Sequence, residues 1–342
     1  MRRHPATSRS LAVLAALVAA AAALGLSTGS SELGPLDAVA VLWRSLWGAE
    51  TDSFARVIIV DVRLPRVLLG LAVGAALAVS GSVLQAVFRN PLAEPTLVGV
   101  SSGAALGAAI AIVSGLGQLM PAALRASFLP LCAAAGGAVT TLFIQQIARR
   151  GGETVTATLL LAGLAITAFV NALLGLAMHF ADDSQLRNLT FWMLGSLGGS
   201  TSLQVWVALP FMVLPIFVVT RKARQLDALL LGEVEAAHLG IEVERLKRSS
   251  VAWAALMVGA AVAMSGVIGF VGLIVPHLVR LLVGPSHAAL LPRAALGGAL
   301  LLLLADVVAR TAVAPTELPI GALTAMLGAP FFLWLLLNGR RA

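Results

Sequence analysis

The sequence predicts an all-α, polytopic membrane protein with about ten transmembrane helices. Of its 342 residues, 59% are apolar and only 11% are charged, whereas soluble domains contain about 25% charged residues. Eight runs of more than 20 residues contain no Asp, Glu, Lys or Arg, and about 20 apolar residues cross a bilayer as a helix. The runs lack the period-two alternation of a membrane β-barrel. These features exclude a soluble enzyme, a fibrous protein, a disordered chain and a protein with a single membrane anchor.

The expected spans follow from the charge-free runs and from the breaks within them. The first, 11–31, follows a basic N-terminus, as a signal peptide also would, but in a chain of many spans we expect it to be retained. Pro276, Gly284, Pro285 and Pro292 interrupt the eighth and ninth spans, so the eighth should be short and irregular. Spans two to ten are expected at 66–88, 96–114, 125–148, 155–178, 203–220, 249–268, 270–283, 290–308 and 319–338.

The distribution of basic residues predicts that both termini lie in the cytoplasm. In this topology 16 Lys and Arg residues lie on the cytoplasmic side and seven lie outside, as expected from the retention of basic loops in the cytoplasm. A nine-span topology would place Arg340 and Arg341 outside, and we reject it. Residues 1–342 then form one transmembrane domain, with external segments at 31–65 and 179–202 and one larger cytoplasmic segment at 221–248.

Ionisable side chains are nearly absent from the expected spans, although an ion-coupled or proton-coupled carrier needs them there. Asp306 and Arg310 lie four residues apart near the outer end of span nine, where they can pair on one helix face. His277 follows a proline and is expected to cap or pack at a helix break. The single Cys132 excludes a disulfide framework and a cysteine-based zinc site. No GxxxxGK[ST] phosphate loop occurs, so another subunit would have to supply energy from ATP.

The cytoplasmic segment 221–248 has the features of a docking element. Gly232 precedes a short helical stretch, EVEAAHL, and Gly240 can end this stretch in a left-handed conformation. A second amphipathic stretch, IEVERLKR, follows it. Two short helices beneath a membrane bundle suit contact with a cytoplasmic partner, although a solvated loop could have the same composition.

Several stretches resemble the permease subunits of ATP-binding-cassette importers for iron-siderophores, haem and vitamin B12, of the FecCD type. They occur in the order of that family and extend over nearly the entire chain. The matching stretches lie at 63–66 (RLPR), 80–107, 159–167, 229–241, 266–284, 302–310 and 317–336.

The resemblance implies a homodimeric permease in the inner membrane, working with two cytoplasmic ATPase subunits and a periplasmic binding protein. The chain itself would not be an enzyme. The resemblance assigns docking of the binding protein to three external arginines, Arg63, Arg66 and Arg310. It also assigns the ATPase contact to residues 229–241, in which we single out Gly232, Glu233, Ala236, His238 and Gly240.

The expected cargo is haem. The stretch ADDSQLRNLTFWMLGSLGG (181–199) resembles haem permeases most closely. Haem is a flat apolar ring with two carboxylates, so its pathway should be apolar with basic residues at the mouth. We expect Arg187, Met178 and Phe191 to line this pathway, although Arg187 could instead anchor its helix at the membrane interface. No permanently bound cofactor or metal is expected.

Ferric siderophore and vitamin B12 remain alternative cargoes within the same family. A stand-alone secondary carrier is a competing class, but the segment 221–248 and the scarcity of ionisable groups in the spans argue against it. A structural membrane subunit without a transport pathway is a further alternative, and the family resemblance argues against it.

Overall fold

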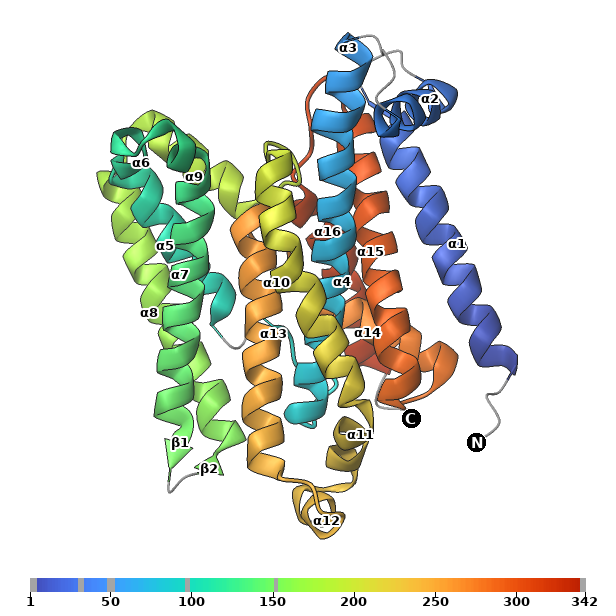
Figure 1. The fold of residues 1–342 in the computed structure, drawn as a ribbon. Coiled ribbons are helices and arrows are strands. Elements are labelled where there is room, and N and C mark those ends of the chain that lie inside the picture. Colours follow the sequence, from blue (N-terminus) through green and yellow to red (C-terminus); the bar gives the residue numbers. More distant parts are fainter. Residues whose placement is uncertain (1–4, 30–33, 48–52, 96–98, 151–152, 339–342) are drawn as a thin grey trace.

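Helices build almost the whole protein (Figure 1). The computed structural model describes residues 5–29, 34–47, 53–95, 99–150 and 153–338. Within these residues the all-α fold class is confirmed, apart from two strands of two residues each. In chain order the elements are α1 (Pro5–Ser27), α2 (Pro35–Leu46), α3 (Ser53–Arg56), the π-helical η1 (Val57–Arg63), α4 (Leu64–Val87), α5 (Val100–Val113), α6 (Leu116–Leu119), α7 (Ala122–Ala148), β1 (Arg149–Arg150), β2 (Glu153–Thr154), α8 (Thr156–Phe180), α9 (Asp183–Met193), α10 (Ser202–Arg221), α11 (Ala223–Leu231), α12 (Glu233–His238), α13 (Val243–Ser265), α14 (Val271–Val283), α15 (His287–Thr311) and α16 (Ile320–Asn338).

Seven helical segments of the described chain are long and apolar enough to cross a membrane. Shorter apolar helices lie in α5, α14 and α16, so the number of ten spans stays a prediction. Helix α1 begins, and α16 ends, toward the end of the bundle that carries α12 (Figure 1). We call this the inner end, and the opposite end, with α2, α6 and α9, the outer end. Four arginines used to predict the topology lie outside the described residues: Arg2, Arg3, Arg340 and Arg341.

Two expected boundaries are wrong. The helix of span two does not begin at Arg66 but is continuous from Ser53, because the apolar residues 57–60 extend it toward the outer end. In the inner segment, IEVERLKR does not form a separate helix. Val243 begins α13, and the second short helix precedes α12 as α11. Of the external segment 31–65, residues 31–33 and 48–52 lie outside the described chain, and the rest carries α2, α3 and η1.

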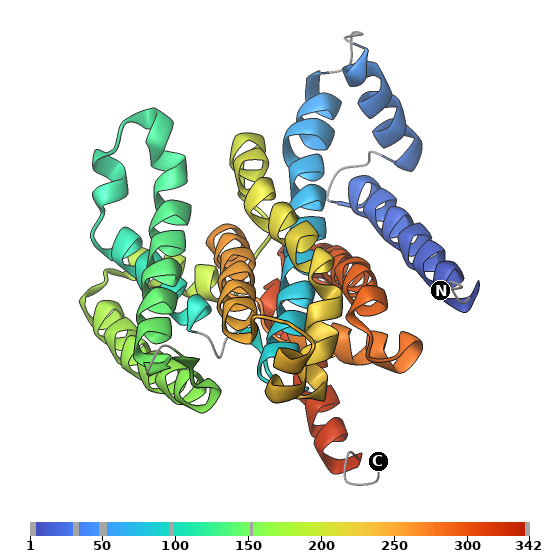
Figure 2. The same ribbon diagram turned by 60° about the horizontal axis from the view of Figure 1, so that its bottom comes forward.

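Helix α4 forms the centre of the bundle. Of its 24 residues, 20 are buried, and it packs against α10, α13, α14 and α15. A helix that is apolar on every side is expected in such a position. On one side of α4, α15 separates it from α1. On the other side, α13 separates it from α5, α7 and α8 (Figure 2).

Small residues let the backbones around α4 come into direct contact. A Cβ on Gly74 would overlap the carbonyl oxygen of Gly298 in α15, and a Cβ on Gly298 would overlap that of Gly74. A Cβ on Gly81 would overlap the carbonyl of Gly272 in α14. Lipid chains are as apolar as the helices, so close packing through such residues holds membrane helices together.

Replacing Gly74 by Ala should therefore lower the apparent melting temperature in detergent. The added methyl group would force α4 and α15 apart, and overpacking of this kind costs about 1–3 kcal/mol. Gly175→Ala is the matched control, because a Cβ on Gly175 meets nothing within 4 Å. Equal melting temperatures for the two variants would show that the α4–α15 contact tolerates separation.

Candidate functional site

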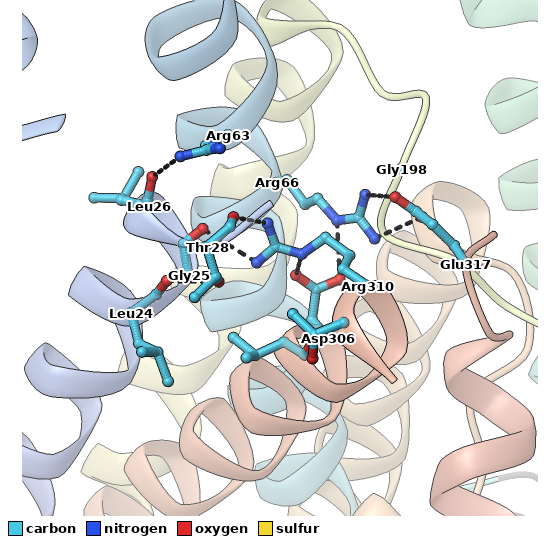
Figure 3. A network of polar contacts seen from close by, with 12 residues as sticks. Leu24, Gly25, Leu26, Thr28, Arg63, Arg66, Gly198, Asp306, Arg310 and Glu317 are labelled. Carbon is cyan, nitrogen blue, oxygen red and sulfur yellow. Dashed lines mark hydrogen bonds and ion pairs between the residues drawn. The ribbon is translucent and has the colours of Figure 1, made fainter. Parts of the chain in front are cut away.

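A buried ionic cluster joins α4, α15 and the loop before α16 at the outer end (Figure 3). The Arg66 guanidinium donates from Nε to Asp306 Oδ1 at 2.9 Å and from Nη1 and Nη2 to the two carboxylate oxygens of Glu317 at 2.8 and 2.9 Å. The other Asp306 oxygen lies 3.1 Å from Nε of Arg310. The pairing of Asp306 with Arg310 that their spacing predicts is thus confirmed.

Two of the arginines also bind the end of α1. Arg310 donates to the carbonyl oxygens of Thr28 and Gly25 at 2.9 and 3.1 Å, and Arg63 donates to that of Leu26 at 2.7 Å. The last carbonyls of a helix have no partner within the helix. These guanidinium groups satisfy them and attach α1 to the rest of the bundle.

The three arginines expected to dock the binding protein lie at the outer end, but their side chains are not exposed there. Arg63 and Arg66 are 4% and 9% exposed, and the Arg310 side chain is 7% exposed. Carboxylates and carbonyls of the same chain accept hydrogen bonds from all three guanidinium groups. Their role in docking a binding protein stays a prediction.

Sequence reasoning missed Glu317. Its carboxylate makes the bidentate contact with Arg66, which fixes the geometry of both side chains. The available signal was that Glu317 is the one charged residue between Arg310 and Arg340. Beside Arg66 a polar cavity of about 500 Å³ opens at the outer end. Its other lining residues are Asp61, Val62 and residues 197–203.

The inner end has the predicted helix termini. Gly232 precedes α12 with φ of +140°, and Gly240 follows it with φ of +82°. The left-handed Gly240 donates its N–H to the Ala237 carbonyl at 2.9 Å, and the next N–H, of Ile241, bonds to Ala236 at 3.1 Å. The predicted left-handed end of this short helix is confirmed.

The orientation of α12 differs from the expectation. Ala236 is fully buried and belongs to the main core, so its side chain does not face outward in this structure, and its contact with the ATPase stays a prediction. Three apolar residues in and beside α12, Leu231, Val234 and Leu239, are each about two-thirds exposed (66%, 64% and 65%). They form what we call the inner apolar patch.

Glu233 and His238 lie at the two ends of α12. Glu233 accepts hydrogen bonds from Nζ of the buried Lys247 at 3.0 and 3.2 Å, so it fixes α12 to α13. His238 is exposed. Of the five residues expected at the ATPase contact, the structure therefore gives Gly232, Gly240, Glu233 and Ala236 roles in shaping the segment and leaves His238 on its surface.

A second polar cluster ties the inner segment to α15. Asp227 of α11 accepts hydrogen bonds from the backbone N–H of His287 at 2.7 Å and from the Ser286 hydroxyl at 3.1 Å, and it lies 2.7 Å from His287 Nδ1. Burial would raise the pKa of Asp227, but the contacts with His287 and Ser286 outweigh it and lower the pKa. Asp227 thus caps the start of α15 from a neighbouring helix.

The expected pathway residues are only partly brought together. Arg187 and Phe191 lie four residues apart on α9, and both are exposed. Met178 is in α8, half-buried against the cluster around Leu174 and Leu189. Leu189 lies on the buried face of α9, and Met178 packs on that side of the helix. Arg187 and Phe191 lie on the exposed side of α9, so Met178 is separated from them. Among the described residues, no group of three His, Cys, Asp or Glu could hold a metal ion.

Comparisons with known proteins place these features in context. The profile of the FecCD transport family matches residues 16–338. The hemin transport system permease protein HmuU of Yersinia pestis is 45% identical over 315 residues, 92% of each chain. The vitamin B12 import system permease protein BtuC of Escherichia coli O9:H4 (strain HS) is 47% identical over 281 residues, which are 82% of this chain and 84% of that protein.

Solved structures agree with the helical architecture. A metal-chelate type ABC transporter in an inward-facing conformation gives a TM-score of 0.83 at 33% identity, covering 97% of this chain and 99% of that chain. PsaBC from Streptococcus pneumoniae gives a TM-score of 0.56 at 16% identity, covering 85% and 94%. The second likeness extends to the fold alone.

Replacing Asp306 by Asn should destabilise the protein much more than replacing Glu317 by Gln. Asp306 is 1% exposed and faces two guanidinium groups, and removing one partner of a buried ionic pair costs about 3–5 kcal/mol. The Glu317 side chain is 47% exposed, so neutralising it should cost about 1 kcal/mol or less. Apparent melting temperatures in detergent check this difference, and equal shifts would contradict it.

Acid titration gives a second measurement on Glu317. Hydrogen bonding to Arg66 lowers the pKa of Glu317. The stabilisation by the ionised Glu317 carboxylate is therefore fully present above the ordinary glutamate pKa. It is lost as the pH falls through the lowered pKa of the folded protein. Between about pH 5 and pH 3, the melting temperature of Glu317→Gln should fall less than that of the unmodified protein. Parallel curves would show that the Arg66–Glu317 contact adds no stability.

Proposed function

The chain belongs to the FecCD transport family, and from this premise we propose that it is the permease for haem in an inner-membrane importer. It is a multi-pass membrane protein and the permease type of an ATP-binding-cassette importer, so ATP is hydrolysed by a separate subunit. In the proposed complex two copies form one pathway, two ATPase subunits bind the inner end, and a periplasmic binding protein delivers haem at the outer end.

The exposed pair of Arg187 and Phe191 on α9 carries the proposal for haem. The pair offers a cation and an aromatic face side by side at the outer end, which suits the propionates and the ring of haem. The similarity to a hemin permease over nearly the full length of both chains supports the same cargo. Vitamin B12 is the second candidate, because permeases named for it are as similar in sequence.

Exposed apolar faces of α8 and α16 support the proposed homodimer. Both helices stand at the margin of the bundle (Figure 2). Large apolar side chains of α8 and α16 are more than half exposed in the single chain: Leu161, Leu164, Phe169, Leu176, Met326, Leu327, Leu333, Trp334 and Leu337. A twofold interface uses the same surface of both copies, and these faces leave the ionic cluster and the inner apolar patch free.

The inner apolar patch supports the proposed ATPase contact. Helix α12 projects from the inner end of the bundle (Figure 1), and Leu231, Val234 and Leu239 present apolar side chains there. Gly232 and Gly240 at the ends of α12, together with the Glu233–Lys247 contact, hold this helix in a fixed position. An exposed apolar patch on a rigid element suits contact with a partner protein.

Uptake into vesicles tests the function. The chain is reconstituted with its ATPase, and the binding protein is supplied with haem, vitamin B12 or a ferric siderophore. We expect the vesicles to accumulate haem, in a reaction that depends on ATP, and not to accumulate vitamin B12 or the siderophore. Accumulation of vitamin B12 instead would assign the alternative cargo. Accumulation by the permease alone under a proton gradient would contradict the importer.

Val234→Asp and Leu239→Asp should uncouple the permease from its ATPase without unfolding it. Each places a charge in the inner apolar patch, and burying an unpaired charge at an interface should weaken it by about tenfold or more. Val155→Asp makes the same change at an exposed inner-end residue outside the patch and serves as the control. Co-purification and transport-coupled ATP hydrolysis are the measurements. Ala236→Asp should instead lower the melting temperature, because Ala236 is buried.

The docking role of Arg66 can be tested through Glu317. If a carboxylate of the binding protein has to replace Glu317 on Arg66, Glu317→Gln removes the internal competitor and should tighten association. Asp61→Asn is the matched control, since Asp61 is exposed and lines the same outer cavity and its loss changes the net charge equally. Equal effects of both variants on the association constant would show that only the overall charge of this face matters.

A further inference from the structure

An apolar groove of about 670 Å³ runs between α7, α10 and α13. Helices α7 and α10 each pack along α13, on opposite sides of it (Figure 2). Four of the lining residues are polar: Ser127, Thr141, Gln145 and Gln204. The floor is the face of α13 that carries small side chains: Ala252, Ala255, Gly259, Ala260 and Ala263.

The groove is as long as a membrane is thick. Its lining residues on α7 run from Ser127 to Gln145, which at 1.5 Å per residue is about 27 Å, against about 30 Å for the hydrocarbon core. Near the outer end, Gln204 donates to the Ala126 carbonyl at 2.6 Å and connects α10 to α7. An apolar space of this kind attracts little water, and its walls lack contacts unless an apolar ligand fills it.

The inner mouth of the groove is basic. Arg248 and Arg245 lie four and seven residues before Ala252, so they continue the same face of α13 toward the inner end. Arg248 is exposed, and Lys222, at the end of α10, donates to Ser249 Oγ at 2.7 Å. Burial and the charge of Arg245 lower the pKa of Lys222.

Acidic residues nearby only partly balance this charge. Glu242 forms an exposed ion pair with Arg245 at 3.2 Å. Glu244 also has an interaction partner. Lys222 and Arg248 therefore present positive charge at the point where the groove meets the membrane surface. A fitting ligand is apolar along its length and anionic at its inner end.

We propose that the groove binds an anionic phospholipid of the inner leaflet. One acyl chain lies along the small residues of α13 in the inner half of the groove, and the phosphate group binds Arg248 and Lys222. Basic sites between transmembrane helices bind anionic headgroups in this way, with about 1 kcal/mol from each Lys or Arg near the surface. The site is separate from the ionic cluster and from the inner apolar patch.

Lipid titration of the delipidated, detergent-solubilised protein tests the proposal. Phosphatidylglycerol should raise the melting temperature more than phosphatidylcholine, and native mass spectrometry should detect retained phosphatidylglycerol. Arg248→Gln should weaken phosphatidylglycerol binding about fivefold, and Arg248→Gln combined with Lys222→Gln should abolish the preference. Arg224→Gln, which removes an exposed charge on α11 that does not line the groove, is the matched control and should have a much smaller effect.

Filling the groove gives a measurement independent of charge. Ala252 is exposed at the inner end of the floor, so Ala252→Phe should displace bound lipid while the protein remains folded. An unchanged amount of retained lipid, or equal stabilisation by the two phospholipids, would overturn the proposal. So would efficient cross-linking of an Ala252→Cys, Cys132→Ser variant to a second copy in membranes, because the groove would then hold protein.

Discussion

The backbone contact between α4 and α15 is the constraint on which the other features depend. These helices run in opposite directions and meet at Gly74 and Gly298. Arg66 lies eight residues from Gly74 toward the outer end, and Asp306 lies eight residues from Gly298 in the same direction. At 1.5 Å per residue both lie about 12 Å from the contact. The register that the glycines fix is therefore also the register that lets the guanidinium reach the carboxylate.

Helix α15 joins the two ends of the molecule. Its first residue, His287, is held by Asp227 of the inner segment, and its last turns carry Asp306 and Arg310 of the outer cluster. A shift of α15 would break several hydrogen bonds to charged side chains at once, both at its inner end and at its outer end. A displacement of α11 and α12 by a partner at the inner end thus acts directly on a helix whose other end supports the outer cluster.

The sequence predicted the features that depend on local chemistry and missed those that depend on neighbours. Charge-free runs predicted the helical membrane fold, glycine predicted the left-handed end after α12, and helix spacing predicted the Asp306–Arg310 pair. A helix of six residues is too short for its periodicity to show which face is buried, so the burial of Ala236 was missed. The burial of Arg63 and Arg66 depends on carbonyls of α1 and on Glu317, which lie far away in sequence. Only the packed bundle brings them together.

The attachment of α1 has a consequence for the order in which the protein assembles during synthesis. Helix α1 has its main contacts with α15, which begins about 260 residues after α1 ends. At a synthesis rate of about 5–20 residues per second, α1 waits roughly 10–50 s for its partner. During that time lipid surrounds it, and the carbonyls of Gly25 and Thr28 lack the guanidinium of Arg310. Helix α1 is made long before α15 but reaches its final place only after it, and its surface, which is apolar and carries no charge after Arg9, suits a long period in the bilayer.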